Sequence, residues 1–184
     1  QLCENREIGM IVLSGTYHSV MLMDRGMRPL TPSFLWSYTG AKELCAALRG
    51  DREYVRDYYN KTGCMVHALY PFFKLKHLQS QGLALGDGYI LGQGGYNFFR
   101  MTGVRAEMDS MASGTGFFNI NDLSYDKSLL SELGIRPEQL PALARWNETR
   151  PLAREAANLL GIQPGIPVMA AGPIEITADT IEYR

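Results

Sequence analysis

The stretch VLSGTYHSVMLMD, residues 12–24, decides the fold of this chain. It joins two apolar runs, IGMIVL at 8–13 and SVMLMD at 19–24, through a polar segment that ends at His18. Short apolar runs bounded by turn residues predict β-strands. The sequence therefore predicts a strand, a polar break and a second strand, with a histidine exposed at the break.

Helical spacing takes over after these two strands. Leucines and aromatic residues recur three and four positions apart, Asp51 stands where an N-cap belongs, and glycines close several segments. The segments predicted as helices are 41–50, 51–60, 71–79, part of 96–103, 126–134 and 151–161. The apolar run IPVMAA at 166–171 predicts one more strand. The fold class is therefore α/β, with a helix-rich middle and a mixed sheet containing the three predicted strands.

Composition limits the classes of function. The chain has 184 residues, 46% of them hydrophobic and 20% charged, which is the balance of one globular unit. Lys and Arg number 18 against 19 Asp and Glu, so there is no broad basic surface for a nucleic acid. The longest uncharged run, 8–23, is interrupted by polar residues and is shorter than a membrane span. We expect neither a nucleic-acid nor a membrane partner.

The cysteines and glycines predict no cofactor site on their own. Cys3, Cys45 and Cys64 are odd in number and widely spaced, which favours small buried side chains in a reducing, cytoplasmic compartment. Cys64 and His67 have a ligand-like spacing, but no second pair completes a tetrahedral metal site. The glycine-rich segments 82–95 and 112–118 match neither phosphate-binding pattern. We therefore predict no metal site and derive no nucleotide site.

Several motifs, taken in order, resemble one known family. They are SGTYHSVMLMD, RPLTPSFLW, KTGCMVHALYPFFKLKHL and RMTGVRAEMDSMASGTGFFNI, followed by LGIRPEQLPAL and LLGIQPGIPVMAAG. In this order and spacing they are similar to the N-terminal domain of the FGGY family of carbohydrate kinases, the xylulokinase and gluconokinase group. The resemblance runs from about residue 10 to about residue 172. It implies an incomplete ribonuclease H-like, actin-like ATPase domain.

The resemblance also implies a sugar pocket. Thr16, Tyr17 and His18 fall on positions that line it, and an imidazole suits a polyol because it both donates and accepts hydrogen bonds. Taken without the family, His18 is more typical of a partly buried histidine whose hydrogen bonds are satisfied. Since strand side chains alternate, Tyr17 and His18 are expected to point away from the core that Val12 and Val20 fill.

Other pocket positions come from later motifs. Trp36 matches a tryptophan whose indole covers a sugar, although a core aromatic is an equal alternative. His67 and Leu69 lie in the segment that closes the pocket. Lys74 matches a family lysine, and its position on a helix favours a surface side chain over a ligand. Asp109 is expected to orient a loop.

Three departures from the family pattern bear on activity. Tyr38 and Gly40 stand where the family has an aspartate and an arginine, and the glycines at 94–95 stand where many relatives have Lys-Glu. The general base of phosphoryl transfer is expected just after the strand at 166–171, where this chain has Pro173 or Ile174. The carboxylates of Glu175 and Asp179 are nearby but out of register.

These observations predict that residues 1–184 form part of a sugar-binding N-terminal domain. The phosphate loop and the ATP-binding C-terminal domain are expected outside this chain. ATP and Mg²⁺ would serve the full-length kinase, which phosphorylates a sugar or sugar acid of the xylulose or gluconate class, and this chain alone would be inactive. The alternative is a truncated or degenerate relative that binds sugar or has a structural role without catalysis. Self-association through exposed apolar surface is also expected.

Overall fold

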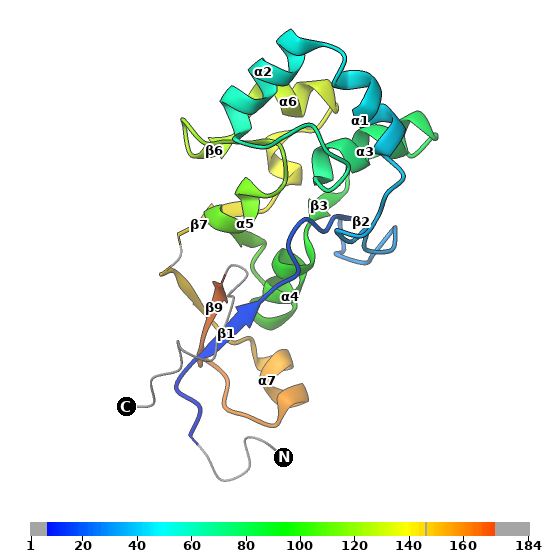
Figure 1. Cartoon of the computed structure of the whole chain (residues 1–184). Coiled ribbons are helices and arrows are strands. Elements are labelled where there is room, and N and C mark those ends of the chain that lie inside the picture. Colours follow the sequence, from blue (N-terminus) through cyan, green and yellow to red (C-terminus); the bar gives the residue numbers. More distant parts are fainter. Residues whose placement is uncertain (1–6, 146, 172–184) are drawn as a thin grey trace.

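The computed structural model describes residues 7–145 and 147–171. Figure 1 shows an elongated arrangement in which α1 (Lys42–Leu48), α2 (Arg52–Thr62), α3 (Pro71–Ser80) and α6 (Lys127–Glu132) gather at one end. At the other end lie β1 (Ile11–Ser14), β9 (Pro167–Ala171) and α7 (Arg154–Leu160), and α4 (Gln93–Thr102) lies between the two groups.

The sheet at the lower end of Figure 1 joins the two ends of the described chain. β1 pairs in parallel with β9, with Ile11 opposite Val168, and β8 (Thr149–Pro151) pairs antiparallel on the other side of β9. The strands predicted at 8–13 and 166–171 are therefore confirmed. Their pairing needs a long crossover, as parallel strands do.

β2 (Met21–Met23) does not belong to that sheet. It pairs antiparallel with β3 (Tyr89–Leu91), so the prediction of one sheet containing all three strands is wrong. The cause is the turn at residues 15–18, after which Val20 exchanges backbone hydrogen bonds with Phe34. Two further pairs complete the described strands: β4 (Ala106–Met108) with β7 (Ala142–Ala144), in parallel, and β5 (Phe118–Asn119) with β6 (Ser124–Tyr125), antiparallel.

All six predicted helices are present. The Asp51 carboxylate caps α2 by accepting from the Glu53 and Tyr54 amides, and Gly103 and Gly161 end α4 and α7 in the left-handed conformation. α4 begins earlier than expected, at Gln93, and the short α5 (Asp109–Ser113) was not predicted. No helix in ranges 7–145 and 147–171 is both long enough and apolar enough to cross a bilayer.

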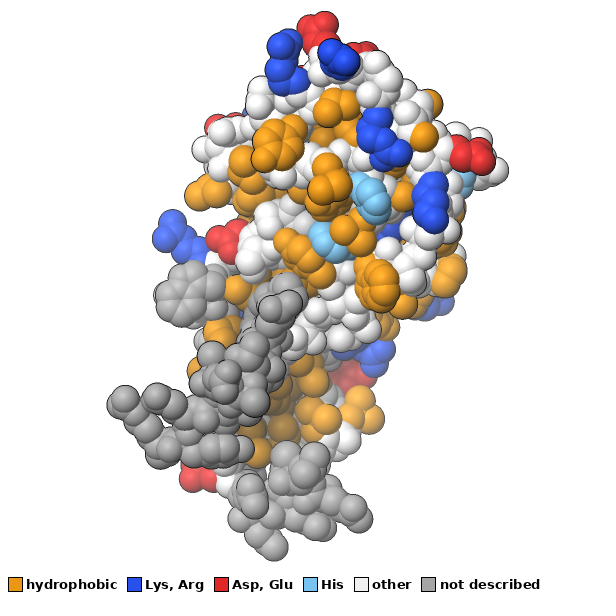
Figure 2. Space-filling view, in the orientation of Figure 1, with side chains coloured by type: hydrophobic (Ala, Val, Ile, Leu, Met, Phe, Trp, Pro, Cys, Tyr) orange, Lys and Arg blue, Asp and Glu red, His pale blue; other side chains and the backbone are white. Residues whose placement is uncertain are grey.

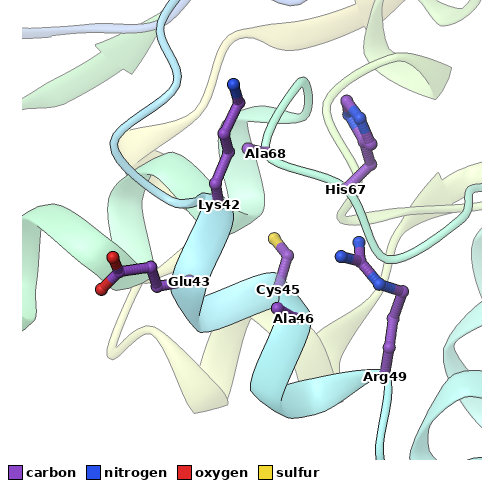
Figure 3. Close-up of a pocket in the computed structure, with 7 residues that line it drawn as sticks. All are labelled: Lys42, Glu43, Cys45, Ala46, Arg49, His67 and Ala68. Carbon is purple, nitrogen blue, oxygen red and sulfur yellow. The ribbon is translucent and has the colours of Figure 1, made fainter.

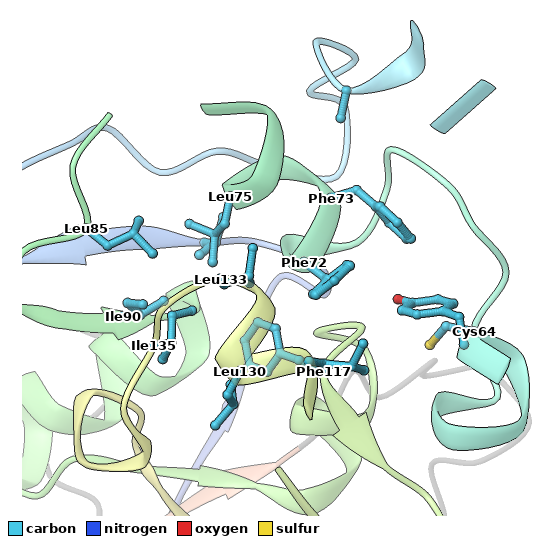
Figure 4. Close-up of a cluster of buried hydrophobic side chains, with 14 of the residues drawn as sticks. Cys64, Phe72, Phe73, Leu75, Leu85, Ile90, Phe117, Leu130, Leu133 and Ile135 are labelled. Carbon is cyan, nitrogen blue, oxygen red and sulfur yellow. The ribbon is translucent and has the colours of Figure 1, made fainter. Parts of the chain in front are cut away.

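The largest hydrophobic cluster packs α3 against α2, α6 and the segment that follows α5 (Figure 4). Phe72 and Phe73 are fully buried, and Tyr58 donates a hydrogen bond of 2.8 Å to the Gly116 carbonyl. Cys45 and Cys64 are buried in this cluster as free thiols, as predicted, whereas Cys3 lies outside the described residues. Because α3 is buried around its first turn, its polar side chains must find partners inside the protein.

A second cluster holds α4 and α7 against the β1–β9 pair. Its buried members are Phe98, Ala106, Ala144, Leu152, Ala156, Ala157 and Val168. Ile11 and Leu13 pack against it, whereas Val12 is 46% exposed. The prediction that Val12 fills the core is therefore wrong, because the strand alternation places Ile11 and Leu13 inward. Val20 is buried as expected.

Candidate functional site

The site begins at the turn between β1 and β2. His18 has a φ of 59°, a left-handed conformation that a side chain with a Cβ rarely adopts. Such a residue persists only where its surroundings hold it. Three sets of contacts hold His18 in this conformation: the contacts of its ring, those of the neighbouring Tyr17 and those of the His18 carbonyl.

The His18 ring is fixed by the residue that ends α5 and by two aromatic neighbours. Nδ1 lies 2.7 Å from the Gly114 carbonyl, which can only accept, so Nδ1 carries the proton and donates. The ring lies 4.0 Å from that of Tyr17 and 5.0 Å, edge to face, from that of Tyr70, measured between centroids. Burial lowers the pKa of His18, the Gly114 hydrogen bond opposes this, and Lys74 lowers it further. The neutral ring therefore leaves Nε2 as an acceptor.

Tyr17 is fixed by the same short helix. Its hydroxyl donates 3.0 Å to the Ser110 carbonyl and lies 3.1 Å from Ser113 Oγ. A Cβ on Gly114 would lie 2.4 Å from Tyr17 Cζ, so the close approach of this ring requires glycine. Asp109 accepts from the Ser110 amide at 2.7 Å, at the start of the same helix.

Thr16 ties the turn to the start of α4. Its amide donates 3.2 Å to Gln93 Oε1, while Ser19 Oγ accepts from the Gln93 amide at 2.8 Å and donates to the Thr16 carbonyl at 3.1 Å. A Cβ on Gly15 would lie 2.9 Å from the Gly94 Cα. Gly94, one of the departures from the family pattern, therefore lies where the turn and the helix make a close backbone contact.

A buried carboxylate lies behind this turn. Glu107 on β4 is 5% exposed, and a Cβ on Gly92 would lie 3.0 Å from its Oε1. Burial raises the pKa of Glu107 to about 7, opposed by a hydrogen bond from the Gly95 amide. Thr16, His18 and Glu107 line one cavity of about 10 Å³, which is room for a single water. This space is too small for a sugar.

The third restraint on His18 is Lys74. Its side chain is fully buried, so the prediction of a surface side chain is wrong. Nζ donates to the His18 carbonyl at 2.5 Å and to the Leu35 carbonyl at 2.8 Å. Burial lowers the pKa of Lys74 to about 8. Because one nitrogen binds both carbonyls, the two carbonyls lie close together. Leu35, the residue before Trp36, therefore lies beside the turn.

The remaining candidate residues are more open. Trp36 is 61% exposed, His67 is exposed, and Leu69 is half-buried and donates its amide to His67 Nδ1 at 3.1 Å. Figure 2 shows histidine side chains lying among exposed hydrophobic ones on one face of the molecule. The structure thus brings Thr16, Tyr17 and His18 together in one turn, with Trp36 following a segment tied to it.

His67 opens onto a different hollow. A pocket of about 410 Å³ lies between α1 and the 67–68 segment, lined by Lys42, Glu43, Cys45, Ala46, Arg49, His67 and Ala68. In Figure 3, Arg49 and His67 lie on one side of this pocket and Glu43 points away from it. Neither Thr16 nor His18 lines this pocket, so the two groups of predicted residues do not share one described cavity.

The expected base position lies outside the described residues. Pro173, Ile174, Glu175 and Asp179 all belong to the segment 172–184. Within the ranges that the structure describes, no three His, Cys, Asp or Glu side chains are grouped as metal ligands.

Sequence reasoning missed four contributors to the site: Ser19, Gln93, Glu107 and Gly114. Gly114 lies in the glycine-rich segment 112–118, which is visible in the sequence. Its hydrogen-bond partner His18 is distant along the chain, so no local pattern predicts the pair. The only signal for Glu107 is a charged residue within a short apolar strand.

Comparisons with known proteins agree with this architecture. Residues 1–177 match the FGGY family of carbohydrate kinases, N-terminal domain. The chain is 28% identical over 169 residues to gluconokinase of Bacillus subtilis, covering 88% of this chain and 32% of that protein. It is 21% identical over 197 residues to xylulose kinase of Streptomyces coelicolor, covering 91% and 40%.

The solved structures give the same result. The crystal structure of gluconate kinase from Lactobacillus acidophilus superposes with a TM-score of 0.85 at 29% identity, covering 92% of this chain and 35% of that one. Ligand-bound xylulose kinase from the same organism gives the same values. The chain spans about a third of the length of the gluconokinase and gluconate kinase that it matches. The chain therefore belongs to the FGGY family of carbohydrate kinases and has the fold of their N-terminal domain.

Proposed function

We propose that this chain is the sugar-binding part of an ATP-dependent carbohydrate kinase. The observation that carries the proposal is the neutral His18 ring, whose Nδ1 is occupied by Gly114 and whose Nε2 is left as an acceptor. A sugar hydroxyl is a donor that fits such an acceptor. Tyr17 beside it and Trp36 on the neighbouring segment supply aromatic surface of the kind that covers sugars.

The substrate class follows from the relatives. They are named gluconokinase and xylulose kinase, so a sugar or sugar acid of the xylulose or gluconate class is the proposed ligand. Thr16 is proposed to hold the turn, whereas His67 and Leu69 are proposed to contact the ligand from the segment before α3, outside the small cavity that Thr16 and His18 line.

ATP and Mg²⁺ are proposed as cofactors of the whole kinase. The described residues do not fit the phosphates, because the start of α4, which would attract an anion, has the Glu107 carboxyl beside Gly92 and Gly95. We therefore derive no phosphoryl-transfer step from these residues. ATP would supply the phosphoryl group when bound by the complete kinase.

The second candidate function is a sugar-binding or structural module without catalysis. It is favoured by one sequence observation, the proline or isoleucine at 173–174 where the family has its base. A sugar-binding module predicts sugar binding at His18, as the kinase does, and differs from it in catalysis, whereas a purely structural module predicts neither.

Calorimetric titration of the 184-residue chain with gluconate, xylulose, ribulose and glycerol tests the shared part of the proposal. We expect heat of binding from at least one of them and no sugar-dependent ADP release when ATP and Mg²⁺ are added. The absence of binding to every sugar would contradict the proposal, and sugar-dependent ADP release would show that this chain alone is active.

A further inference from the structure

Lys74 lies where the backbone pairing of two segments stops. Val20 and Phe34 exchange hydrogen bonds of 3.0 and 2.8 Å and form an isolated bridge. The carbonyls of His18 and Leu35, one on each segment, are bound instead by Lys74 Nζ. Lys74, which belongs to α3, thus links the two segments through its side chain next to the Val20–Phe34 pair.

The chemistry of this contact is unusual for a lysine. The side chain is fully buried and forms no ion pair with a carboxylate in the ranges that the structure describes. A buried ammonium needs hydrogen-bond acceptors to offset its lost hydration, and carbonyls bound to a charged donor give stronger bonds than neutral pairs do. The charge is therefore retained through the two carbonyls alone.

We propose that Lys74 is a positioning residue for the sugar site: Nζ and the carbonyls of His18 and Leu35, here named the Lys74 clasp, hold the His18 turn and the Trp36 segment at a fixed separation. The expected effect on sugar affinity rests on the proposed sugar-binding function. The existence of the clasp does not depend on that function. The His18 ring is held by Gly114, whereas Trp36 is 61% exposed, and Lys74 Nζ binds a carbonyl on each of the two segments. Without the clasp, the separation of the turn and the Trp36 segment is left to the Val20–Phe34 pair, and a sugar must order the two on binding.

The test uses Lys74→Met, which keeps the length of the side chain and removes its donors. The matched control is Lys76→Met on the same helix, whose ammonium pairs with Glu132 at the surface and touches neither carbonyl. Amide hydrogen exchange is measured in segments 15–20 and 33–38, with α7 as the internal reference because it packs in the second cluster.

In Lys74→Met we expect exchange in both segments to be about tenfold faster or more, with α7 unchanged, since two charge-assisted bonds are lost. Sugar affinity should fall by about tenfold, whereas Lys76→Met should leave both properties within about twofold. Unchanged exchange, faster exchange in only one segment, or equal acceleration in α7 would overturn the clasp. Unchanged sugar affinity with faster exchange in both segments would overturn its role in positioning.

Two other outcomes are also decisive. If the unmodified chain binds no sugar, the proposed function fails, while the exchange experiment still decides whether the clasp exists. If Lys74→Met does not fold, the ¹⁵N-detected ammonium signals of the unmodified protein replace it. A Lys74 ammonium protected from exchange, beside a rapidly exchanging Lys76, supports the clasp, and two equally rapid signals overturn it.

Discussion

His18 combines a left-handed backbone with a ring whose nitrogens have different roles. Nδ1 is used by the fold, through Gly114, and we propose that Nε2 binds the ligand. The sequence motif alone places a histidine in the turn, but it does not say which nitrogen is available. That assignment comes from an acceptor at the end of α5, far along the chain.

Replacing His18 with alanine should weaken sugar binding by roughly 1–3 kcal/mol, because a hydroxyl would lose its acceptor in a partly buried place. Alanine at a φ of 59° also strains the backbone. His18→Asn is the matched control, since asparagine tolerates this conformation and its amide N–H can replace Nδ1. Calorimetry should show lost affinity in both variants, with lower thermal stability mainly in the alanine variant. Full affinity in His18→Asn would contradict the role of Nε2.

Sugar binding should depend on pH in one direction. Burial, opposed by the Gly114 bond and aided by Lys74, holds the pKa of His18 below its usual value of 6.5. The acceptor is therefore present at neutral pH and is lost as the pH falls through the lowered pKa. Calorimetric titrations at neutral and mildly acidic pH should show affinity falling toward the acid end. This dependence should disappear in His18→Asn, and affinity that increases on acidification would contradict the assignment.

At the scale of elements, α3 and the turn after α5 depend on each other. The Phe72 amide donates to the Thr115 carbonyl at 2.9 Å, and Tyr58 on α2 binds the Gly116 carbonyl. Gly116 has a φ of 80°, and a Cβ there would lie 2.5 Å from the Tyr58 hydroxyl. The glycine is needed both for its conformation and for the space it leaves.

Gly116→Ala should therefore destabilise the fold by more than the conformational strain of about 1 kcal/mol alone. Gly82→Ala separates the two effects, because Gly82 has a φ of 92° and a Cβ added there would have no heavy atom within 4 Å. Chemical denaturation should give a clearly larger loss of unfolding free energy for Gly116→Ala than for Gly82→Ala. Equal losses would show that the contact with Tyr58 costs nothing.

At the scale of the whole molecule, the β1–β9 pair leaves one face open. Ile11 and Leu13 point into the second cluster, while Met10 and Val12 are 49% and 46% exposed. β1 has a paired neighbour on one side only in the described sheet. Exposed edge strands and apolar patches favour association between chains.

We therefore expect the isolated chain to self-associate, and Val12→Lys to reduce this by placing a charge on the exposed face. Leu159→Lys is the control, since Leu159 is 76% exposed and belongs to α7 rather than to the strand. Sedimentation velocity at several concentrations should show a larger decrease in association for Val12→Lys. A monomer at all concentrations would contradict the prediction.

The sequence by itself determined the elements that depend on neighbours along the chain. Apolar runs predicted β1 and β9, helical spacing predicted six helices, and capping residues such as Asp51 and Gly161 marked where helices begin and end. These signals are local because the hydrogen bonds that satisfy them lie within a few residues. The motif around His18 also indicated the family, which the comparisons confirm.

Only the tertiary structure decided which of these elements meet. A helical lysine looked like a surface residue because helix position does not reveal what covers the helix, and α3 proved to be buried around its first turn at Lys74. The partners of His18, the carboxyl of Glu107 behind the turn and the separation of β2 from β1 all depend on contacts between distant segments. Such contacts follow from burial and hydrogen-bond satisfaction across the whole core, and local patterns in the chain carry no record of them.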